Sequence, residues 1–187
     1  MSLDRDTILV ENFRQSLDLY QRSLVWAMTA SAAFFILSLN LGDPQFSTVS
    51  VLYGRLSGPA AWFVSLALFF VLGILAGSAL HSAKTVRARF AAPSDIVEAV
   101  LLYPSLATNA YGVVRVGTVL FSPVVVLIGI VIELRREWPG SNGHDLSWWL
   151  TLAAYVILLV APYGRIAFLL RHPLGSPSSQ PARLART

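Results

Sequence analysis

The sequence contains no cysteine and few charged residues, and each shortage narrows the class of protein. Without cysteine the chain has no disulfides, thiolate metal sites, iron–sulfur ligands or cysteine nucleophiles. Charged residues make up 13% of the 187 positions, against about 25% in a soluble domain of average composition. Hydrophobic residues make up 55%, and the mean hydropathy is +0.62. This composition indicates an integral membrane protein. At this length, the membrane spans leave no room for a separate soluble catalytic domain.

Four long apolar runs predict four transmembrane helices, because about 20 apolar residues are needed to cross about 30 Å of hydrocarbon. The runs cover residues 23–41, 59–80, 116–134 and 147–164. The end of the last run is open, because its apolar character continues to residue 170 beyond Arg165. The predicted fold class is therefore an all-α integral membrane protein, with a four-helix transmembrane domain over residues 23–170.

Lysine and arginine are distributed unevenly among the segments that flank these runs. Of the 14 such residues, only Arg55, Arg135 and Arg136 fall in the first and third connections. All the others lie in or beside the amino-terminal segment, the second connection and the carboxyl-terminal segment. Positive charge near a transmembrane end is retained in the cytoplasm, and four crossings put these three richer segments on one side. We therefore expect a multi-pass protein of the plasma (inner) membrane with both termini cytoplasmic.

Tryptophan placement fits this orientation. The amphipathic indole ring prefers the headgroup layer of a bilayer. Trp26 falls near a predicted inner end, and the other four tryptophans fall at predicted outer ends: Trp62, Trp138, Trp148 and Trp149. We expect these rings to lie at the two membrane surfaces.

An apolar stripe precedes the first run, within the cytoplasmic segment 1–22. Val10, Phe13, Leu17 and Tyr20 recur at intervals of three and four residues, which places them on one face of a helix. The predicted amphipathic helix either lies in the inner interface, or continues the first span into the cytoplasm and faces a partner helix. The spacing leaves both alternatives open.

Three segments between and after the runs carry weaker signals. In the second connection, the residues from Ser94 to Tyr103 predict a short helix that is apolar enough to rest on the membrane or on the bundle. The first connection contains a β-prone stretch at residues 46–53, suited to cap the bundle or to pair with a partner. Residues 171–187, rich in proline and serine, predict a flexible cytoplasmic tail.

Arg165 is the only charge flanked on both sides by apolar helix. Charges inside a membrane are costly and often functional, although a long side chain near a helix end reaches the headgroups. Depending on where the fourth span ends, Arg165 is either such a side chain or a contact for a lipid head or another anion. Three side chains of the second connection join it as candidate lipid or anion contacts, because anionic headgroups attract them: Lys84, Arg87 and Arg89.

Two glycines and two prolines are expected to shape the spans. Gly73 and Gly77 lie four residues apart in the second span, and small residues at this spacing let another backbone approach closely. Such a face serves either packing inside the bundle or an oligomer contact. Pro123 leaves the carbonyl of Val119 without its helical donor and predicts a kink, and Pro162 is a second candidate kink. No intramembrane carboxylate or histidine accompanies Pro123, so structural bending is favoured over a transport site.

No motif in the sequence predicts an enzyme. His81, His144 and His172 fall in three separate segments, and no helix bears two ligands at metal-binding spacing. A phosphate loop, a Ser-His-Asp set and a dinucleotide fingerprint are absent. We therefore expect no catalytic residue, no cofactor and no metal. The net charge of +4 is spread over juxtamembrane segments, so lipid rather than nucleic acid is the expected anion.

Three functional hypotheses remain. The leading one is a non-catalytic helical membrane subunit or anchor, which assembles with partner proteins through its amphipathic start, its Gly73 and Gly77 face and its inner loop. The second is a homo-oligomeric channel or membrane-perturbing effector. The third is a small transporter or lipid-acting enzyme that uses Arg165. Expected contacts are membrane lipids, together with a protein partner or a second copy of the chain.

Overall fold

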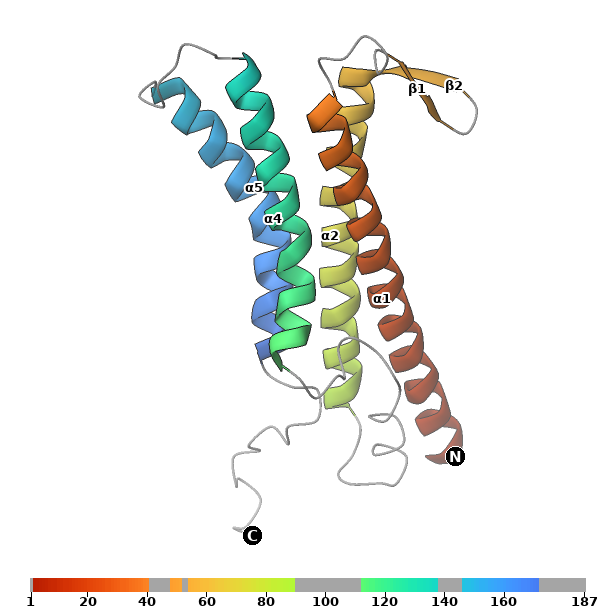
Figure 1. Cartoon of the computed structure of the whole chain (residues 1–187). Helices are drawn as coiled ribbons and strands as arrows, with labels where there is room; N and C mark the ends of the chain where they lie inside the picture. The colour runs from red at the N-terminus through yellow and green to blue at the C-terminus, as the bar shows by residue number, and fades with distance from the viewer. Residues whose placement is uncertain (1, 41–47, 52–53, 90–111, 138–145, 172–187) are drawn as a thin grey trace.

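A computed structural model describes residues 2–40, 48–51, 54–89, 112–137 and 146–171. Its elements in chain order are α1 (Ser2–Asn40), β1 (Thr48–Val51), β2 (Gly54–Ser57), α2 (Gly58–Ala88), α4 (Gly112–Glu137) and α5 (Leu146–Arg171). The helices form two pairs that lie side by side, α1 with α2 and α4 with α5 (Figure 1). The described part of the chain is therefore helical apart from one short pair of strands. The predicted helix at residues 94–103 and the predicted tail after Arg171 lie outside the described residues.

Three to four of these helices are long and apolar enough to cross a membrane. Three qualify singly, over Thr7–Asn40, Gly58–Ala88 and Val116–Arg136. The fourth candidate is α5, which is bent by 44° between Leu159 and Ala161 and qualifies when its two halves are taken together. These helices agree with the predicted multi-pass membrane protein. The number of crossings and the side on which the termini lie stay predictions.

Helix α1 is one continuous helix of 39 residues. At a rise of about 1.5 Å per residue it is about 58 Å long, roughly twice the thickness of the hydrocarbon layer. Helix α2, with 31 residues, is about 46 Å long by the same measure. At the end of the bundle that carries the amino terminus, both helices reach beyond α4 and α5 (Figure 1). We call this the amino-terminal end of the bundle, and the opposite end, beside β1 and β2, the strand end. The segment before the first span therefore continues that span as one helix. This is the second of the two alternatives that the apolar stripe left open.

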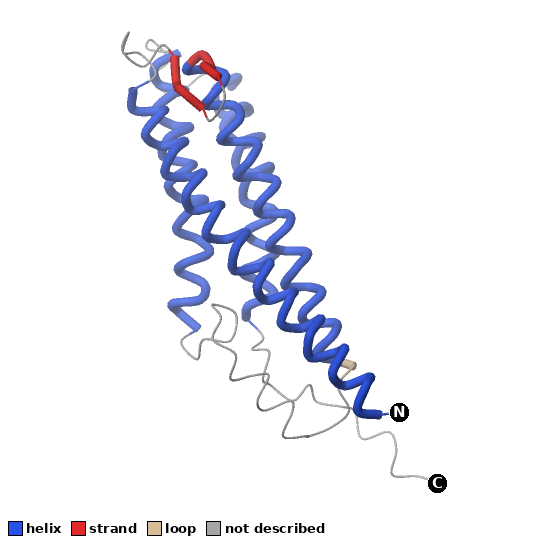
Figure 2. The backbone as a smooth tube through the Cα atoms, turned by 90° about the vertical axis from the view of Figure 1, so that its right-hand side faces the viewer, coloured by secondary structure: helices blue, strands red, loops and turns tan. Residues whose placement is uncertain are grey.

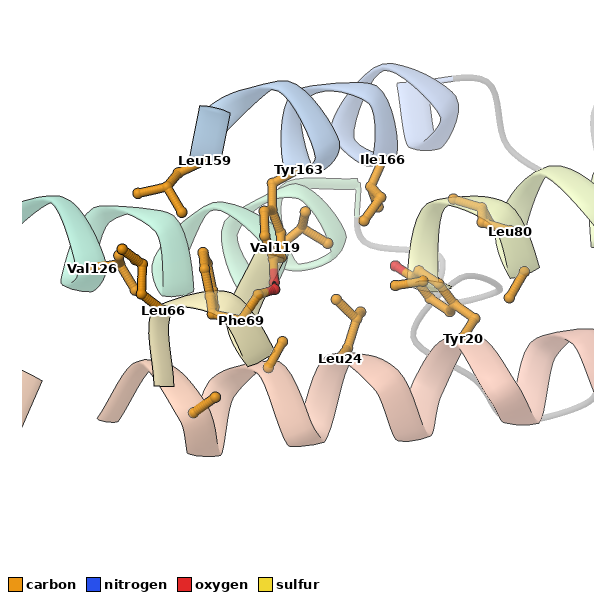
Figure 3. Packing of buried hydrophobic residues seen from close by; sticks show 14 of the residues in the cluster. Tyr20, Leu24, Leu66, Phe69, Leu80, Val119, Val126, Leu159, Tyr163 and Ile166 are labelled. Atoms are coloured by element: carbon orange, nitrogen blue, oxygen red, sulfur yellow. The ribbon is translucent and has the colours of Figure 1, made fainter. Parts of the chain in front are cut away.

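The four helices form a closed ring. Helix α1 contacts α2 and α4, and α5 contacts α2 and α4 in turn. The ring order is therefore α1, α2, α5, α4, and the molecule is elongated along the helix axes (Figure 2). The buried side chains of all four helices meet along the axis of this ring, in one cluster (Figure 3).

Buried side chains line the face that α1 and α2 share. Two hydrogen bonds set their antiparallel register: Ser16 Oγ donates to Ser82 Oγ at 3.4 Å, and Trp62 Nε1 donates to Ser38 Oγ at 2.9 Å. Three alanines lie on the buried side of α2 toward the amino-terminal end, beside the large Leu80: Ala76, Ala79 and Ala83. These small side chains let the two helices approach closely there.

The two strands form an antiparallel pair at the strand end, with Thr48 opposite Ser57. The β-prone stretch 46–53 contains β1, while β2 comes from the residues that follow that stretch. Ser57 then begins α2, because its Oγ accepts a hydrogen bond from the backbone N–H of Ala60 at 3.4 Å. Pro59 stands in the first turn, where a helix needs no backbone donor.

The close packing of α1 on α2 predicts the effect of enlarging one of the alanines. Ala76 is fully buried, whereas Ala67 on the same helix is exposed. We expect Ala76→Leu to destabilise the fold by about 1–3 kcal/mol, because it overfills a packed interface. Thermal unfolding of the purified protein in detergent measures this, and Ala67→Leu should leave the midpoint unchanged. An equal loss in both variants would show that Ala67 is not on the exposed side of α2.

Candidate functional site

Gly73 and Gly77 lie on the face of α2 that packs against α5 of the same chain. A Cβ atom on Gly73 would stand 2.6 Å from Cε2 of Tyr163 and 3.2 Å from Cβ of Pro162. A Cβ atom on Gly77 would stand 3.5 Å from Cγ1 of Ile166. The close approach that the glycine spacing predicts is thus present within the chain, at the contact between α2 and α5.

Tyr163 anchors α5 to α2 at this contact. Its ring stacks on Phe69, with the ring centroids 4.5 Å apart and the planes 12° from parallel. Its hydroxyl donates a hydrogen bond to the Phe69 carbonyl at 2.9 Å, and the side chain is fully buried (Figure 3). In an α-helix that carbonyl also accepts the N–H of Gly73, four residues on. One turn of α2 therefore supplies both the acceptor and the open space that Tyr163 requires.

At the strand end, Ser38 joins three helices. Its hydroxyl donates to the carbonyl of Phe34 at 2.9 Å and accepts the indole N–H of Trp62, also at 2.9 Å. Gly129 of α4 lies against the same pair, because a Cβ atom there would stand 2.7 Å from Cε1 of Phe34 and 2.9 Å from Ser38 Oγ. The small residue on α4 thus admits the polar contact between α1 and α2.

Trp62 lies inside the bundle rather than on its surface. Its ring is 5% exposed and tilted against Phe34, with centroids 4.8 Å apart. The physical reason is that Ser38 gives the indole N–H a partner inside the bundle. Trp26 and Trp149 are exposed, as an interfacial ring would be.

Arg136 of α4 reaches the end of α1. Its guanidinium donates to the carbonyls of Ser38 at 3.4 Å and Leu39 at 3.5 Å, and it pairs with Glu133 at 3.3 Å. The last carbonyls of a helix have no intrahelical donor and carry partial negative charge. Arg136 therefore satisfies the end of α1 from the other helix pair. We call this contact the strand-end clamp.

Lys84 of α2 makes a similar contact at the amino-terminal end. Its ammonium donates to the backbone carbonyl of Leu169, in the last turn of α5. The sequence predicted Lys84 as a contact for lipid heads, whereas the structure places its ammonium on a carbonyl of the chain itself. The unsatisfied carbonyls at the end of α5 provide the acceptor. We call this contact the amino-terminal clamp.

The apolar stripe that was predicted to face a partner is covered by the chain itself. Phe13, Leu17 and Tyr20 have no exposed surface, and Val10 is half-buried beside them. They belong to the same buried cluster as the alanines of α2. The partner helix of this stripe is thus α2, which continues alongside α1 beyond the ends of α4 and α5.

The opposite side of the same α1 segment is exposed. Four residues at intervals of four, three and four follow one another along it, and we call them the ridge: Ile8, Asn12, Gln15 and Leu19. Ile8 is 55% exposed and Leu19 is 49% exposed. Two large apolar side chains therefore stand on a side of α1 that is otherwise polar.

The predicted lipid or anion contacts do not form one site. Arg165 is exposed on α5 and has no hydrogen bond or ion pair with the described residues. Its neighbour Ile166 lies against Gly77. Arg87 is half-buried, and Arg89 is exposed at the end of α2, about 18 Å beyond Gly77. The structure thus separates Arg165 from the cations at the end of α2.

The two candidate kinks differ. The 44° bend of α5 lies between Leu159 and Ala161, directly before Pro162. Pro123 is buried inside α4, a helix of 26 residues that qualifies as one unbroken span.

Within the described residues, no group of three or more His, Cys, Asp or Glu side chains is placed to hold a metal ion. His81 is exposed on α2, and His144 and His172 lie outside the described residues. No protein-family model matches the sequence, and neither a curated protein nor a solved structure matches the chain. Function is therefore inferred from the geometry above.

Sequence reasoning missed the polar contacts that join the helices. A basic residue within a turn of a span end is a signal for carbonyl binding, and Arg136 and Lys84 both carry it. The receiving helix depends on the ring order, which the sequence does not give. Ser38 carries no signal of its own, because a serine in a helix ordinarily bonds its own backbone.

The close contact at Gly73 makes its response to alanine unusual. Replacing a helical glycine with alanine ordinarily favours the helix by about 1 kcal/mol. We expect this gain for Gly117→Ala, where a Cβ atom would meet nothing within 4 Å. We expect Gly73→Ala to lower the thermal unfolding midpoint instead, because the Tyr163 ring must shift. Equal midpoints for the two variants would show that the α2–α5 contact is looser than described.

Proposed function

We propose that the protein is a non-catalytic membrane subunit that holds the amino-terminal part of α1 outside the bilayer as a contact site for a partner protein. It crosses the membrane four times with both termini cytoplasmic. The observation that carries this proposal is the exposed ridge on α1, which starts at Ile8, where α1 reaches beyond α4 and α5. A large apolar side chain that stays exposed outside the bilayer favours a protein contact.

The packing of α1 on α2 supports a role in binding. Because Phe13, Leu17 and Tyr20 are buried, the ridge on the opposite side is held in a folded helix before any partner arrives. Binding to a preorganised helix avoids the entropy cost of ordering the segment. The ridge is also mixed, with Asn12 and Gln15 between two apolar residues. Polar residues within an apolar seam restrict which helix can pair with it and in which register.

The charge distribution supports the orientation. Exposed arginines of the described residues gather toward the amino-terminal end on three helices, among them Arg22, Arg89 and Arg165. The strand end has Arg55 in β2, Arg136, which belongs to a clamp, and its neighbour Arg135. Positive charge near span ends is retained in the cytoplasm, so the ridge faces the cytoplasm.

The absence of cysteine from the chain makes this orientation simple to test. Single cysteines are introduced by Gln15→Cys at the amino-terminal end and by Ser147→Cys at the strand end, both at exposed positions. A membrane-impermeant maleimide applied to intact cells should label the Ser147→Cys variant. The Gln15→Cys variant should react only after the cells are permeabilised. Labelling of both variants in intact cells, or the reverse pattern, would overturn the proposed topology.

The ridge itself is tested by photo-crosslinking in the native membrane. A photoreactive phenylalanine derivative replaces Asn12 in one variant and the exposed, apolar Ile74 of α2 in the control. We expect a discrete protein adduct from position 12 and only lipid adducts from position 74. A product at twice the mass of the chain would favour the homo-oligomer over a partner subunit. Absence of any protein adduct from position 12 would overturn the ridge as a contact site.

A further inference from the structure

The exposed side chains of α1, α2 and α5 change character at one level near the amino-terminal end. On α2, the large exposed apolar residues end at Leu75, and the next exposed position is Ser78. On α1, Arg22 stands one turn before the exposed Val25 and Trp26. The contact between Ser16 and Ser82 places these parts of α1 and α2 at matching heights. We call this level the amino-terminal rim.

Arg165 stands at the same rim. Its neighbour Ile166 packs against Gly77, between Leu75 and Ser78 of α2. The rise from Gly58, where α2 begins, to Gly77 is about 28 Å, close to the thickness of the hydrocarbon layer. A helix that begins at one membrane surface thus reaches the other at the height of Arg165.

The exposed residues that follow Arg165 on α5 suit this boundary. Phe168 is 60% exposed, and Arg171 is exposed in the last turn. Arg171 lies about 9 Å beyond Arg165, slightly more than the depth of one headgroup layer. Two guanidinium groups therefore border that layer, with an aromatic ring between them.

Neither arginine has a hydrogen bond or ion pair with the described residues, in contrast to other cations of the bundle. Arg22 pairs with Asp18 at 3.3 Å, and Lys84 is bound to the Leu169 carbonyl. The Lys84 contact also favours an anion nearby, because the ammonium offsets the negative end of the α5 dipole.

We propose that Arg165 and Arg171 bind the phosphate groups of anionic phospholipids in the leaflet at the amino-terminal end. The two residues lie six positions apart, on different sides of α5, so each guanidinium contacts a headgroup of its own. The planar guanidinium matches phosphate oxygens with two parallel N–H donors, which an ammonium group does not. Phe168, about 4.5 Å beyond Arg165, would then lie within the headgroup layer. Arg87 and Arg89 lie about 15 and 18 Å beyond the rim, outside that layer.

The test measures lipid binding to the purified, delipidated protein in detergent, by native mass spectrometry with phosphatidylglycerol or phosphatidylcholine. Arg165→Gln removes the charge at the rim, and Arg89→Gln is the matched control beyond it. We expect the wild type to prefer phosphatidylglycerol. Arg165→Gln should weaken that binding about five-fold, as expected for one basic residue near an anionic surface, and Arg89→Gln should not. Arg165→Lys should restore part of the affinity, since it keeps the positive charge but lacks the two parallel N–H donors of the guanidinium.

Four results would overturn the proposal. They are equal binding of the two lipids, unchanged binding by Arg165→Gln, an equal loss in Arg89→Gln, and displacement of phosphatidylglycerol by millimolar inorganic phosphate. The third would indicate attraction by net charge, and the fourth a site for free phosphate. An unchanged unfolding midpoint without added lipid confirms that Arg165→Gln folds. The inference rests on the membrane insertion in the proposed function but not on a partner protein, so the lipid and crosslinking results fail or succeed separately.

Discussion

A helix that ends near the surface of an apolar medium leaves carbonyl groups without helical donors, and these groups take donors from the chain, from water or from lipid headgroups. Two helix ends in this protein receive a cation from the other helix pair. Arg136 of α4 satisfies the end of α1, and Lys84 of α2 satisfies the end of α5. The two clamps lie at opposite ends of the bundle and run in opposite directions between the pairs. Each pair thus depends on the other for a helix end, which binds the four helices into one ring.

Between the clamps, the helices are held mainly by the fit of side chains. In lipid there is little hydrophobic driving force between helices, so close packing and hydrogen bonds decide which faces meet. The ring of Tyr163 packs against Gly73 of α2, and the ring of Phe34 packs against Gly129 of α4. In each place a hydrogen bond accompanies the close approach. The packing of α1 on α2 continues past the ends of α4 and α5. The same packing that builds the bundle therefore also holds the projecting ridge.

Features carried by local spacing and composition could be predicted from the sequence. At the strand end of the bundle, the apolar runs predicted the ends of the described span candidates to within a few residues. The stripe of Phe13, Leu17 and Tyr20 is a buried helical face, as its spacing predicts. What covers that stripe could not be predicted, because it depends on how far α2 continues beside α1. The partners that Trp62 and Lys84 have within the chain could not be predicted for a related reason. Each has a polar group that binds either water and lipid heads or the chain, and only the tertiary arrangement provides Ser38 and the Leu169 carbonyl as partners.

The bend of α5 follows from how its two halves are held. From Leu159 onward, α5 buries a side chain every three or four residues, as far as Leu170. From Leu146 to Leu158 no side chain is fully buried. Pro162 cannot donate to the carbonyl of Leu158 and its ring clashes there. The helix therefore bends where the packed half, with its fully buried side chains, meets the half whose side chains are at most partly buried. A helix of 26 residues is about 39 Å long, and a bend lets it cross a thinner hydrocarbon layer. Tyr163 and Lys84 hold the packed half against α2, so the height of Arg165 is set by the bundle rather than by the length of α5.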